Sequence, residues 1–471
     1  MPHNICMVSD FFYPNAGGVE SHLYHLSQRL IQRGHKVIII THAYGNRTGI
    51  RCLTNGLKVY HVPIMVVFQQ ATPPTLYGFF PIFRSIVLRE QISIVHGHQA
   101  FSSMCHEAII HARTMGLKTC FTDHSLFGFS DPSSIVMNKF LKFTLSDIDH
   151  VVCVSHTSKE NTVLRAALTP QNVSVIPNAV IASRFTPDPS MQDPNVSITG
   201  KEPRDCTDSP EQTLVFLFSL ATIVVISRQT YRKGMDLLVA VVPRICRKYS
   251  KVRFIIGGDG PKRIDLEQMR EKHLLHDRVD LGSIKAHEVR NTLVRGQIFL
   301  NTSLTEAFCI GIVEAACAGL LVVSTKVGGV PEVLPRHMIL FAKPEEDDLV
   351  EAIERSIEMI QRKEVQPAKF NDELKEMYSW VNVAERTEKV YDAILQTRDP
   401  PLIERLRSYY GCGVFVGKLF CIMIALDYLF WVYLEWILPR DEIEVAPKFP
   451  YKKFKKMCQR ADKEDELEHN H

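Results

Sequence analysis

The chain has 471 residues, of which 45% are apolar and 23% are charged, and its formal net charge is +3. This composition excludes a disordered chain, and the near-neutral charge argues against a nucleic-acid-binding protein. The length predicts two to three folded units. The 12 cysteines include no Cys-x-x-Cys pair. That pattern argues against a zinc site or a disulfide framework and indicates buried thiols in a reducing compartment.

The first 185 residues predict an α/β domain built on a parallel sheet. A short apolar strand at residues 5–8 leads through a loop into a helix at 19–33, and a second strand follows at 37–40. Strand–helix–strand units of this kind are typical of parallel sheets. The pattern continues with strands at 92–96, 118–122, 150–154 and 173–176, and with a helix at 102–115.

Residues 186–222 are interpreted as a linker to a second domain. Within them, the stretch Asn195–Leu220 combines a polar run with a short apolar run. Long loops without secondary structure are unusual inside compact domains, so we treat this stretch as an insert, with the hypothesis that it derives from splicing. Residues 223–397 predict a second open α/β domain, with strands at 223–226, 254–257, 298–301 and 321–324.

Two consecutive open α/β domains bind ligands in the crevice between them, at the carboxyl ends of their strands. The first candidate there is the loop Asn15–Glu20, which contains Gly17 and Gly18 at the start of a helix. Adjacent glycines let the backbone approach an anion, and the helix dipole favours a phosphate at this point. An ordinary tight turn is the alternative. The loop lacks both the Walker and the dinucleotide-binding patterns, which disfavours a P-loop kinase or a Rossmann dehydrogenase.

Histidines follow two neighbouring strands. His96 and His98 are predicted at the end of one strand, and His124 lies between Asp123 and Ser125 at the end of the next. Histidines on one rim can bind polar groups or move protons. The sequence shows no further ligand cluster with metal spacing, so we favour contacts to a polar substrate and expect no metal.

The second domain carries three cations and two carboxylates after its strands. Arg228, Arg232 and Lys233 follow the strand at 223–226. Positive charge at a helix N-terminus opposes the dipole unless an anion binds there, so Arg228 and Lys233 are predicted to clamp a diphosphate. A glycine turn, Gly257–Pro261, ends the next strand. Glu306 and Glu314 lie eight residues apart across a loop-to-helix junction, and such a pair can hold the hydroxyls of two sugars.

The C-terminal part contains a long apolar segment that could contact a membrane. The segment Gly413–Leu438 is apolar apart from Lys418, Asp427 and Glu435, and it is long enough to cross a membrane. A buried or interfacial helix is the alternative. Lys418 and Asp427 lie on opposite helix faces, so a spanning helix is predicted to need the helix of a partner. Residues 439–471 form a charged tail whose basic part suits anionic lipids. The N-terminus shows no signal-peptide pattern, which predicts a cytosolic body.

Taken together, these motifs resemble the retaining glycosyltransferases of family four, and the resemblance covers residues 3–395 apart from the insert. Four segments narrow the resemblance to the family of phosphatidylinositol N-acetylglucosaminyltransferase catalytic A subunits. They are FTDHSLFGF at 121–129, TSKENTVLR at 157–165, EAFC at 306–309 and NVAERTEKVY at 382–391. The resemblance implies the α/β GT-B fold, with two Rossmann-like domains facing each other across a cleft. The first would be the acceptor side and the second would bind the donor.

The resemblance also implies an activity: transfer of N-acetylglucosamine from UDP-N-acetylglucosamine to phosphatidylinositol, the first step of GPI-anchor synthesis. The enzyme would work at the endoplasmic reticulum membrane, with its catalytic body in the cytosol, in a complex with other subunits, and without a metal. The implied roles are donor-phosphate contact for Gly17 and Gly18, UDP diphosphate binding for Arg228 and Lys233, sugar contact for Glu306, ribose contact for Glu314, and a place near the reacting centre and the inositol for His124, with His96 and His98 beside it.

Departures from the family pattern leave two alternatives open. Ile181 stands where the family usually has an aspartate, and the insert lies just upstream of the strand that carries Arg228. One alternative is therefore a scaffold copy that has lost activity. The other is a different family-four transferase, for example one that uses GDP-mannose.

Overall fold

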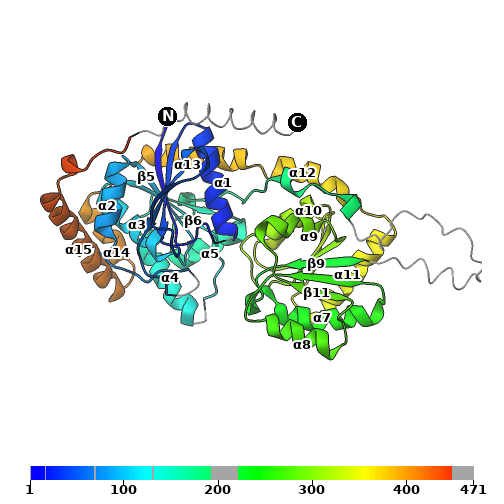
Figure 1. Cartoon of the computed structure of the whole chain (residues 1–471). Coiled ribbons are helices and arrows are strands. Elements are labelled where there is room, and N and C mark those ends of the chain that lie inside the picture. The colour runs from blue at the N-terminus through cyan, green and yellow to red at the C-terminus, as the bar shows by residue number, and fades with distance from the viewer. Residues whose placement is uncertain (1, 16, 68–69, 130–131, 192–220, 448–471) are drawn as a thin grey trace, which may run out of the picture. The chain divides into compact units, whose positions relative to one another are not determined.

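A computed structural model describes residues 2–15, 17–67, 70–129, 132–191 and 221–447. These residues form two compact units (Figure 1). The first unit contains the chain up to Val154, Ser158–Ile176 and the described residues from Trp380 onward, and the second contains Ser155–Thr157 and Pro177–Ser379. The predicted insert Asn195–Leu220 and most of the charged tail lie outside the described residues.

The first unit is built on an eight-stranded sheet with the order β3-β4-β2-β1-β5-β6-β7-β8. Every pair is parallel except β3 with β4. The central strands are buried along almost their whole length because helices cover both faces of such a sheet. The strands are β1 (Asn4–Val8), β2 (Lys36–His42), β3 (Gly49–Cys52), β4 (Lys58–Val62), β5 (Ile94–His98), β6 (Lys118–Asp123), β7 (His150–Cys153) and β8 (Val173–Val175).

Helices from both ends of the chain complete this unit. They are α1 (Gly18–Gln32), α2 (Phe80–Arg89), α3 (Ser103–Thr114), α4 (Pro132–Leu145), α5 (His156–Ala166), α13 (Trp380–Leu395), α14 (Leu402–Tyr410) and α15 (Val416–Ile437).

The second unit has a six-stranded parallel sheet with the order β11-β10-β9-β12-β13-β14. The order reverses between β9 and β12, as in the doubly wound nucleotide-binding folds. Its strands are β9 (Thr222–Ile226), β10 (Arg253–Gly257), β11 (Val279–Gly282), β12 (Ile298–Asn301), β13 (Leu321–Thr325) and β14 (Ile339–Ala342). Its helices are α7 (Met235–Lys248), α8 (Arg263–Lys272), α9 (Val289–Leu293), α10 (Ile310–Cys317), α11 (Glu346–Gln361) and α12 (Phe370–Met377).

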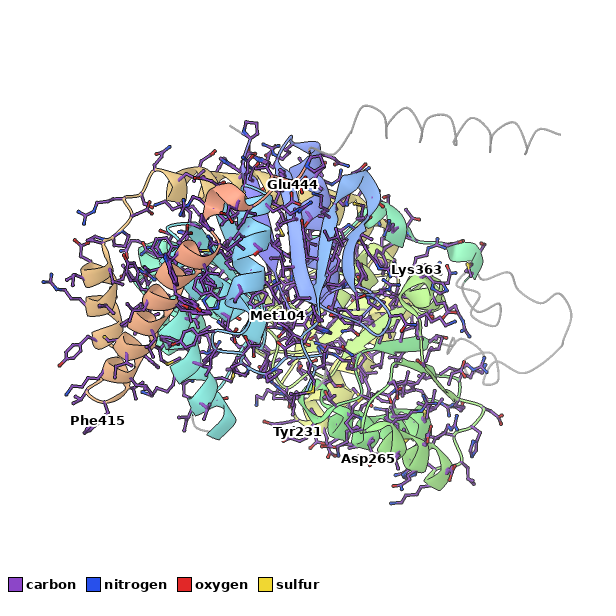
Figure 2. All side chains as sticks on the ribbon, turned by 60° about the vertical axis from the view of Figure 1, so that its left-hand side comes forward. Met104, Tyr231, Asp265, Lys363, Phe415 and Glu444 are labelled. Carbon is purple, nitrogen blue, oxygen red and sulfur yellow. The ribbon has the colours of Figure 1, made fainter. Side chains whose placement is uncertain are left out.

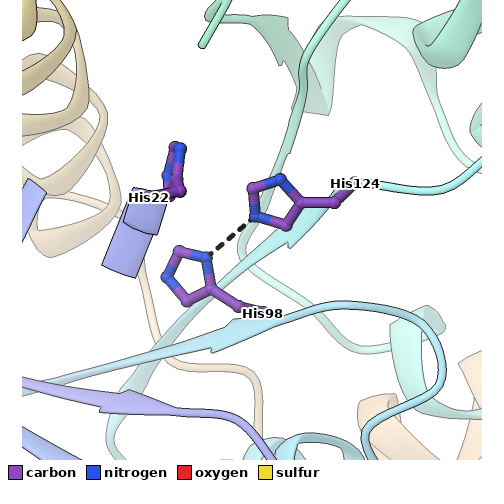
Figure 3. Close-up of side chains that lie close together, drawn as sticks. All are labelled: His22, His98 and His124. Atoms are coloured by element: carbon purple, nitrogen blue, oxygen red, sulfur yellow. Dashed lines mark hydrogen bonds between the residues drawn. The ribbon is translucent and has the colours of Figure 1, made fainter. Parts of the chain in front are cut away.

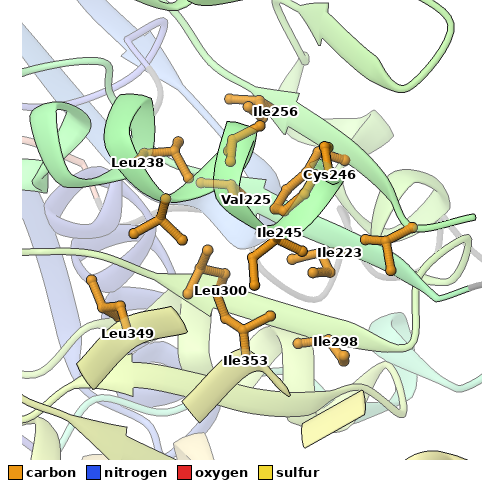
Figure 4. Close-up of a cluster of buried hydrophobic side chains, with 14 of the residues drawn as sticks. Ile223, Val225, Leu238, Ile245, Cys246, Ile256, Ile298, Leu300, Leu349 and Ile353 are labelled. Carbon is orange, nitrogen blue, oxygen red and sulfur yellow. The ribbon is translucent and has the colours of Figure 1, made fainter. Parts of the chain in front are cut away.

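The core of the second unit shows why its sequence folds this way (Figure 4). Alternate residues of a strand share a face, and Ile223 and Val225 of β9 both join the core. Helix α7 adds Leu238 and Ile245, which lie seven residues apart, about two helical turns. All four side chains are buried almost completely. The apolar face of the strand, formed by every second residue, therefore packs against the apolar face of helix α7.

The strands predicted from the sequence are confirmed, with one shift that affects the site. Strand β5 begins at Ile94 instead of Ile92 and ends at His98. The reason is local: the N–H of Ile92 still bonds to the carbonyl of Val87, 2.9 Å away, and so completes the end of α2. His98 is therefore the last residue of the strand, whereas His96 lies inside it.

The predicted second domain ends too late, because α13 packs on the first unit. Its buried face contacts α1 and β6. Arg33, after α1, forms ion pairs with Glu385 and Glu388 of α13, and the hydroxyl of Tyr391 lies 2.6 Å from Nδ1 of His96. Residues 380–397 were expected in the second domain, but these contacts make α13 a part of the first.

The C-terminal helix α15 is long and apolar enough to cross a membrane, and it packs against α3 and α14. Asp427 is 1% exposed. It accepts hydrogen bonds from Nδ1 of His111 at 2.7 Å and from Oγ1 of Thr114 at 2.5 Å, both on α3. The expectation that Asp427 needs a helix from another chain is therefore wrong, since its partners belong to its own chain. Lys418 is exposed.

Replacing Tyr391 with phenylalanine tests the attachment of α13. The change Tyr391→Phe removes one fully buried hydrogen bond to His96, so the free energy of unfolding of the first unit is expected to fall by about 1–2 kcal/mol. Denaturant titration measures the loss, and Tyr410→Phe on the exposed surface of α14 is the matched control. Equal stability of the two variants would contradict the packing of α13 described above.

Candidate functional site

Each sheet has one point where the strand order reverses, and the residues of interest follow the strands on either side of it. In the first unit the reversal lies between β1 and β5. Gly17 and Gly18 come after β1, and His98 ends β5. In the second unit the reversal lies between β9 and β12, and Arg228 and Glu306 follow those two strands. Ligands of open α/β sheets bind at such points, beyond the carboxyl ends of the strands.

The glycine loop of the first unit closes tightly on a carboxylate. Gly17 is the N-cap of α1, and a Cβ at this position would come within 2.4 Å of Oε2 of Glu20. Glu20 is buried, and Nδ2 of Asn15 donates to its Oε1 at 2.7 Å. A carboxylate is favourable at a helix N-terminus because the dipole is positive there. Glu20 thus already occupies part of the place predicted for an anion, and contact of Gly17 and Gly18 with a donor phosphate stays a prediction.

Three histidines come together beside this loop: His22 of α1, His98 of β5 and His124 directly after β6 (Figure 3). Nδ1 of His98 lies 3.3 Å from Nε2 of His124. The rings of His22 and His124 meet edge to face, with centroids 4.6 Å apart. One ring nitrogen of each residue lies within 4.8 Å of the others, so this group could hold a metal ion.

Burial keeps the imidazoles of His98 and His124 neutral. It lowers the pKa of His98 well below the usual value and lowers that of His124 to about 3. A neutral imidazole donates one hydrogen bond and accepts another, or binds a metal. Nε2 of His98 has no hydrogen-bond partner in the described part of the chain. His124 is only half-buried, and of the histidines predicted for the site it is the most accessible.

His96 does not belong to this rim, although the sequence suggested it. It is 1% exposed. Its Nδ1 lies 2.6 Å from the hydroxyl of Tyr391, and its Nε2 lies 2.7 Å from Oγ1 of Thr122. With both ring nitrogens engaged inside the unit, His96 has a structural role between β5, β6 and α13.

Asp123 determines where the His124 turn lies. Its carboxylate accepts hydrogen bonds from the N–H and the hydroxyl of Ser125, at 3.0 and 2.6 Å. It also accepts one from Thr162 at 2.9 Å and forms a fully buried ion pair with Arg165, 3.2 Å away. Removing one partner of such a buried pair costs about 3–5 kcal/mol. Asp123 is therefore a positioning residue, which the sequence alone did not distinguish from a ligand.

In the second unit, the segment that carries Arg228 lies against the glycine turn after β10. Gly258 has a φ of +133°, and a Cβ there would come within 2.0 Å of the carbonyl oxygen of Ser227. The N–H of Gln229 donates to the carbonyl of Asp259 at 2.8 Å. Only glycine permits this approach. The Arg228 side chain is exposed, and within the described residues no acid forms an ion pair with it.

Lys233 and Glu306 form a salt bridge across the switch point of this unit. Oε1 of Glu306 also lies 2.8 Å from the hydroxyl of Ser303, which follows β12. Burial by itself would lower the pKa of Lys233, but the Glu306 carboxylate keeps that pKa above its usual value. The lysine is therefore charged, and an ammonium has three donors, so it can hold Glu306 and a phosphate oxygen together.

Glu314 lies on α10, about one turn into the helix and eight residues after Glu306. Burial raises the pKa of its carboxyl to about 7, and no ion pair to it occurs among the described residues. The helix begins at Ile310, two residues later than the sequence suggested, because Cys309 adopts a left-handed conformation with φ of 68°. Arg228, Lys233, Glu306 and Glu314 thus belong to one unit, as predicted.

The sequence missed His22 and the role of the glycine turn. His22 lies four residues after Gly18 in α1. That spacing puts His22 one turn into the helix, near the carboxyl ends of the strands. The spacing was therefore the signal in the sequence that could have placed His22 at the site. The clash at Gly258 involves the backbone oxygen of Ser227, which directly follows β9, and no local pattern shows such a contact.

Two family models match the chain. The model described as "PIGA (GPI anchor biosynthesis)" matches residues 42–131, and the model described as "Glycosyl transferases group 1" matches residues 219–370. A curated relative from Schizosaccharomyces pombe, the gpi3 subunit of phosphatidylinositol N-acetylglucosaminyltransferase, is 59% identical over 93% of this chain and 91% of its own length. The human A subunit of phosphatidylinositol N-acetylglucosaminyltransferase is 52% identical over 94% of this chain and 87% of its own.

Solved structures agree on the fold. Sucrose-phosphate synthase from Thermosynechococcus elongatus superimposes with a TM-score of 0.67 at 18% identity, over 83% of this chain and 99% of its own. Anabaena HepE in complex with UDP has a TM-score of 0.60 at 16% identity, over 83% and 100%. The fold is therefore GT-B, as the sequence resemblance implied. Given the identity to its curated relatives over almost its full length, the chain belongs to the glycosyltransferase family that comprises the A and gpi3 subunits of phosphatidylinositol N-acetylglucosaminyltransferase.

Proposed function

We propose that this chain catalyses the transfer of N-acetylglucosamine from UDP-N-acetylglucosamine to phosphatidylinositol, with retention at the anomeric carbon. The names of its relatives give the sugar and the acceptor, and the word subunit in those names supports work within a complex. The observation that carries the proposal is the site after β9 and β12. There, exposed Arg228 lies in a rigid turn, and charged Lys233 is held by Glu306.

The second unit binds the donor in this proposal. Arg228 and Lys233 bind the diphosphate and neutralise the charge that grows on the leaving UDP. Glu306, already fixed by Lys233 and Ser303, accepts hydrogen bonds from hydroxyls of the sugar. Glu314 has a carboxyl without an ion pair in the described chain, and it accepts hydrogen bonds from the ribose hydroxyls.

The first unit binds the acceptor. In the retaining step, the bond from the anomeric carbon to the phosphate oxygen breaks. A bond to an inositol hydroxyl oxygen forms on the same face, and the hydroxyl proton passes to a phosphate oxygen of UDP. His124, with a pKa of about 3, is too weak a base to take that proton at neutral pH. As a neutral imidazole it orients the inositol hydroxyl by a hydrogen bond.

The location follows from the acceptor. Phosphatidylinositol is a membrane lipid, and α15 is long and apolar enough for contact with a bilayer. We place the enzyme at the endoplasmic reticulum membrane, with both units in the cytosol, where UDP-N-acetylglucosamine would reach the second unit.

Removing the exposed guanidinium of Arg228 tests the donor site. Arg228→Ala loses a charge-assisted contact worth about 1.5–3 kcal/mol, so the Kd for UDP is expected to rise roughly 10- to 100-fold. Titration calorimetry measures it. Arg247→Ala is the matched control, because Arg247 is also exposed but lies in the last turn of α7. An unchanged Kd for UDP would remove Arg228 from the site.

The same pair of variants tests the whole reaction and the donor. In cells that lack this protein, Arg247→Ala should restore surface display of GPI-anchored proteins, and Arg228→Ala should restore it poorly. A bound donor raises thermal stability, so UDP-N-acetylglucosamine should raise Tm more than GDP-mannose does. Failure of the unaltered chain to restore display would favour the non-catalytic scaffold, and stronger protection by GDP-mannose would favour a mannosyltransferase.

The carboxyl of Glu314 makes stability depend on pH. Its pKa is about 7 in the folded chain against 4.5 when exposed, so the folded state binds more protons between these values. Glu314 therefore does not affect the free energy of unfolding below about pH 4.5. As the pH rises it lowers this free energy, by up to about 3 kcal/mol above pH 7. Glu314→Gln should remove this component, so the variant gains stability over the unaltered chain at pH 8 and not at pH 4.5. Denaturant titrations at both values, with exposed Glu351→Gln as control, measure the difference.

The histidine cluster provides a test of the expected absence of a metal. If Arg228 and Lys233 supply the positive charge, the enzyme should keep its activity after treatment with a strong chelator and dialysis. Metal analysis of the purified chain should then find less than one equivalent of bound ion per chain. Loss of activity on chelation, with recovery on adding one metal, would instead assign that metal to His22, His98 and His124.

A further inference from the structure

Three buried polar residues lie behind Glu306, at the ends of two neighbouring strands of the second unit. Asn301 is the last residue of β12, and Ser324 of β13 pairs with it in register. Ser303 lies two residues after Asn301, in the loop that leads to Glu306. Asn301 is 6% exposed, and both serines are completely buried. Buried polar groups are costly unless they are hydrogen-bonded, so the contacts of these residues matter.

Their side chains form one continuous chain of hydrogen bonds that ends on the carboxylate of Glu306. The amide of Asn301 lies 2.9 Å from Oγ of Ser324 and 2.8 Å from Oγ of Ser303. Oγ of Ser303 lies 2.8 Å from Oε1 of Glu306, and Lys233 binds the same oxygen. The chain thus runs from the interior of the sheet to the surface of the unit, where Figure 2 labels Tyr231 of the turn that carries Lys233.

The number of protons determines the direction of this chain. Two acceptors compete for the single hydroxyl proton of Ser303, the carboxylate of Glu306 and the amide oxygen of Asn301. A charged acceptor makes the stronger hydrogen bond, so the proton goes to Glu306. Two oxygens 2.8 Å apart repel each other without a proton between them, so Asn301 must turn its amide nitrogen toward Ser303. The turned amide has the same shape, and its oxygen then accepts the proton of Ser324.

Other bonds hold the backbone of the loop that carries Glu306. The hydroxyl of Thr325 donates to the carbonyl of Ser303. The N–H of Gly329 donates to the carbonyl of Glu306 at 3.0 Å. Neither bond involves the hydroxyl of Ser303. Loss of that hydroxyl should therefore free the carboxylate of Glu306 while the loop stays in place.

We propose that Ser303 and Asn301 are positioning residues for the donor sugar, and that every proton of the chain from Ser324 points toward Glu306. Ser303 and Lys233 together fix Oε1 of that carboxylate, and Oε2 accepts the hydroxyl protons of the sugar. This proposal rests on the proposed function, in which Glu306 binds N-acetylglucosamine. An acceptor held in this way favours a sugar with a hydroxyl at the matching position, whereas binding of the diphosphate depends on the two cations.

Calorimetry with two ligands tests the positioning role. Ser303→Ala should raise the Kd for UDP-N-acetylglucosamine about tenfold or more. The Kd for UDP should change by less than about twofold, because UDP itself makes no contact with Glu306 in the proposed function. The matched control is Ser356→Ala in α11 of the same unit. Ser356 is also completely buried, and its hydroxyl donates to the carbonyl of Ile353 at 2.7 Å, so this variant loses a similar bond away from the site.

The outcomes separate this proposal from the proposed function. If the unaltered chain binds UDP-N-acetylglucosamine and Ser303→Ala binds it as tightly as Ser356→Ala does, only the positioning role is overturned. Equal weakening of UDP and UDP-N-acetylglucosamine in Ser303→Ala would also overturn it, because general damage to the unit would explain both losses. If the unaltered chain does not bind UDP-N-acetylglucosamine, the proposed function fails and the positioning role fails with it.

Asn301→Asp tests the direction of the chain. The new side chain has nearly the same shape, but in its ionised form it has no proton to donate. At about pH 8, Ser303 should donate to this new carboxylate instead of Glu306, and the Kd for UDP-N-acetylglucosamine should rise about fivefold or more. Burial raises the pKa of a carboxyl group, and once protonated the group can donate. The Kd should therefore recover at about pH 6 in Asn301→Asp but not in Ser303→Ala. An unchanged Kd at about pH 8, or an equal loss at both pH values, would overturn the inferred direction.

Discussion

Parallel pairing of the strands is the constraint from which the site follows. In a parallel sheet every strand ends at the same edge, and the loops at that edge lie together whatever their distance in the sequence. Residues 228 and 306 follow β9 and β12, which are neighbours in the sheet, although 78 positions separate them. In the same way, His98 ends β5 and His124 follows β6, and these two strands are also neighbours. No residue of either site was brought into place by a local motif alone.

Close backbone contacts then make the donor edge rigid. Gly234 is left-handed and lies so near Thr302 that a Cβ would meet its carbonyl oxygen at 1.8 Å. This contact joins the segment after β9 to the segment after β12, which carry Lys233 and Glu306. Cys309, unlike Gly234, has a side chain, yet its backbone is also left-handed. This conformation costs about 1 kcal/mol or more for a residue with a Cβ. The edge is thus held by backbone packing before any ligand arrives, and preorganised charges of this kind need no rearrangement during the reaction.

The sequence predicted most strands because a buried parallel strand is a short apolar run between polar loops, and this pattern is local. It placed Arg228, Lys233, Glu306 and Glu314 in one unit for the same reason. It failed where long-range contacts decide. Ile92 bonds to the end of α2, so β5 begins two residues later than predicted. The strand then ends at His98, and His96 lies inside it. No local pattern showed that α13 packs on α1 and β6 of the first unit. Asp427 appeared as an unpaired acid because its partners in α3 lie more than 300 positions away. The family resemblance came from the order of several motifs along the chain, because no single motif identifies the family.

The return of the chain to the first unit has a consequence for its synthesis. A ribosome makes the sheet of this unit first, then the whole of the second unit, and only afterwards the helices from Trp380 onward that cover His96, Arg33 and α3. Until then the nascent sheet exposes the apolar surface that α13, α14 and α15 later bury, and unfinished α/β domains with such surfaces are prone to aggregate. A premature stop codon near the end of the message would therefore damage the domain that is translated first, while leaving the later, second domain with all of its own residues.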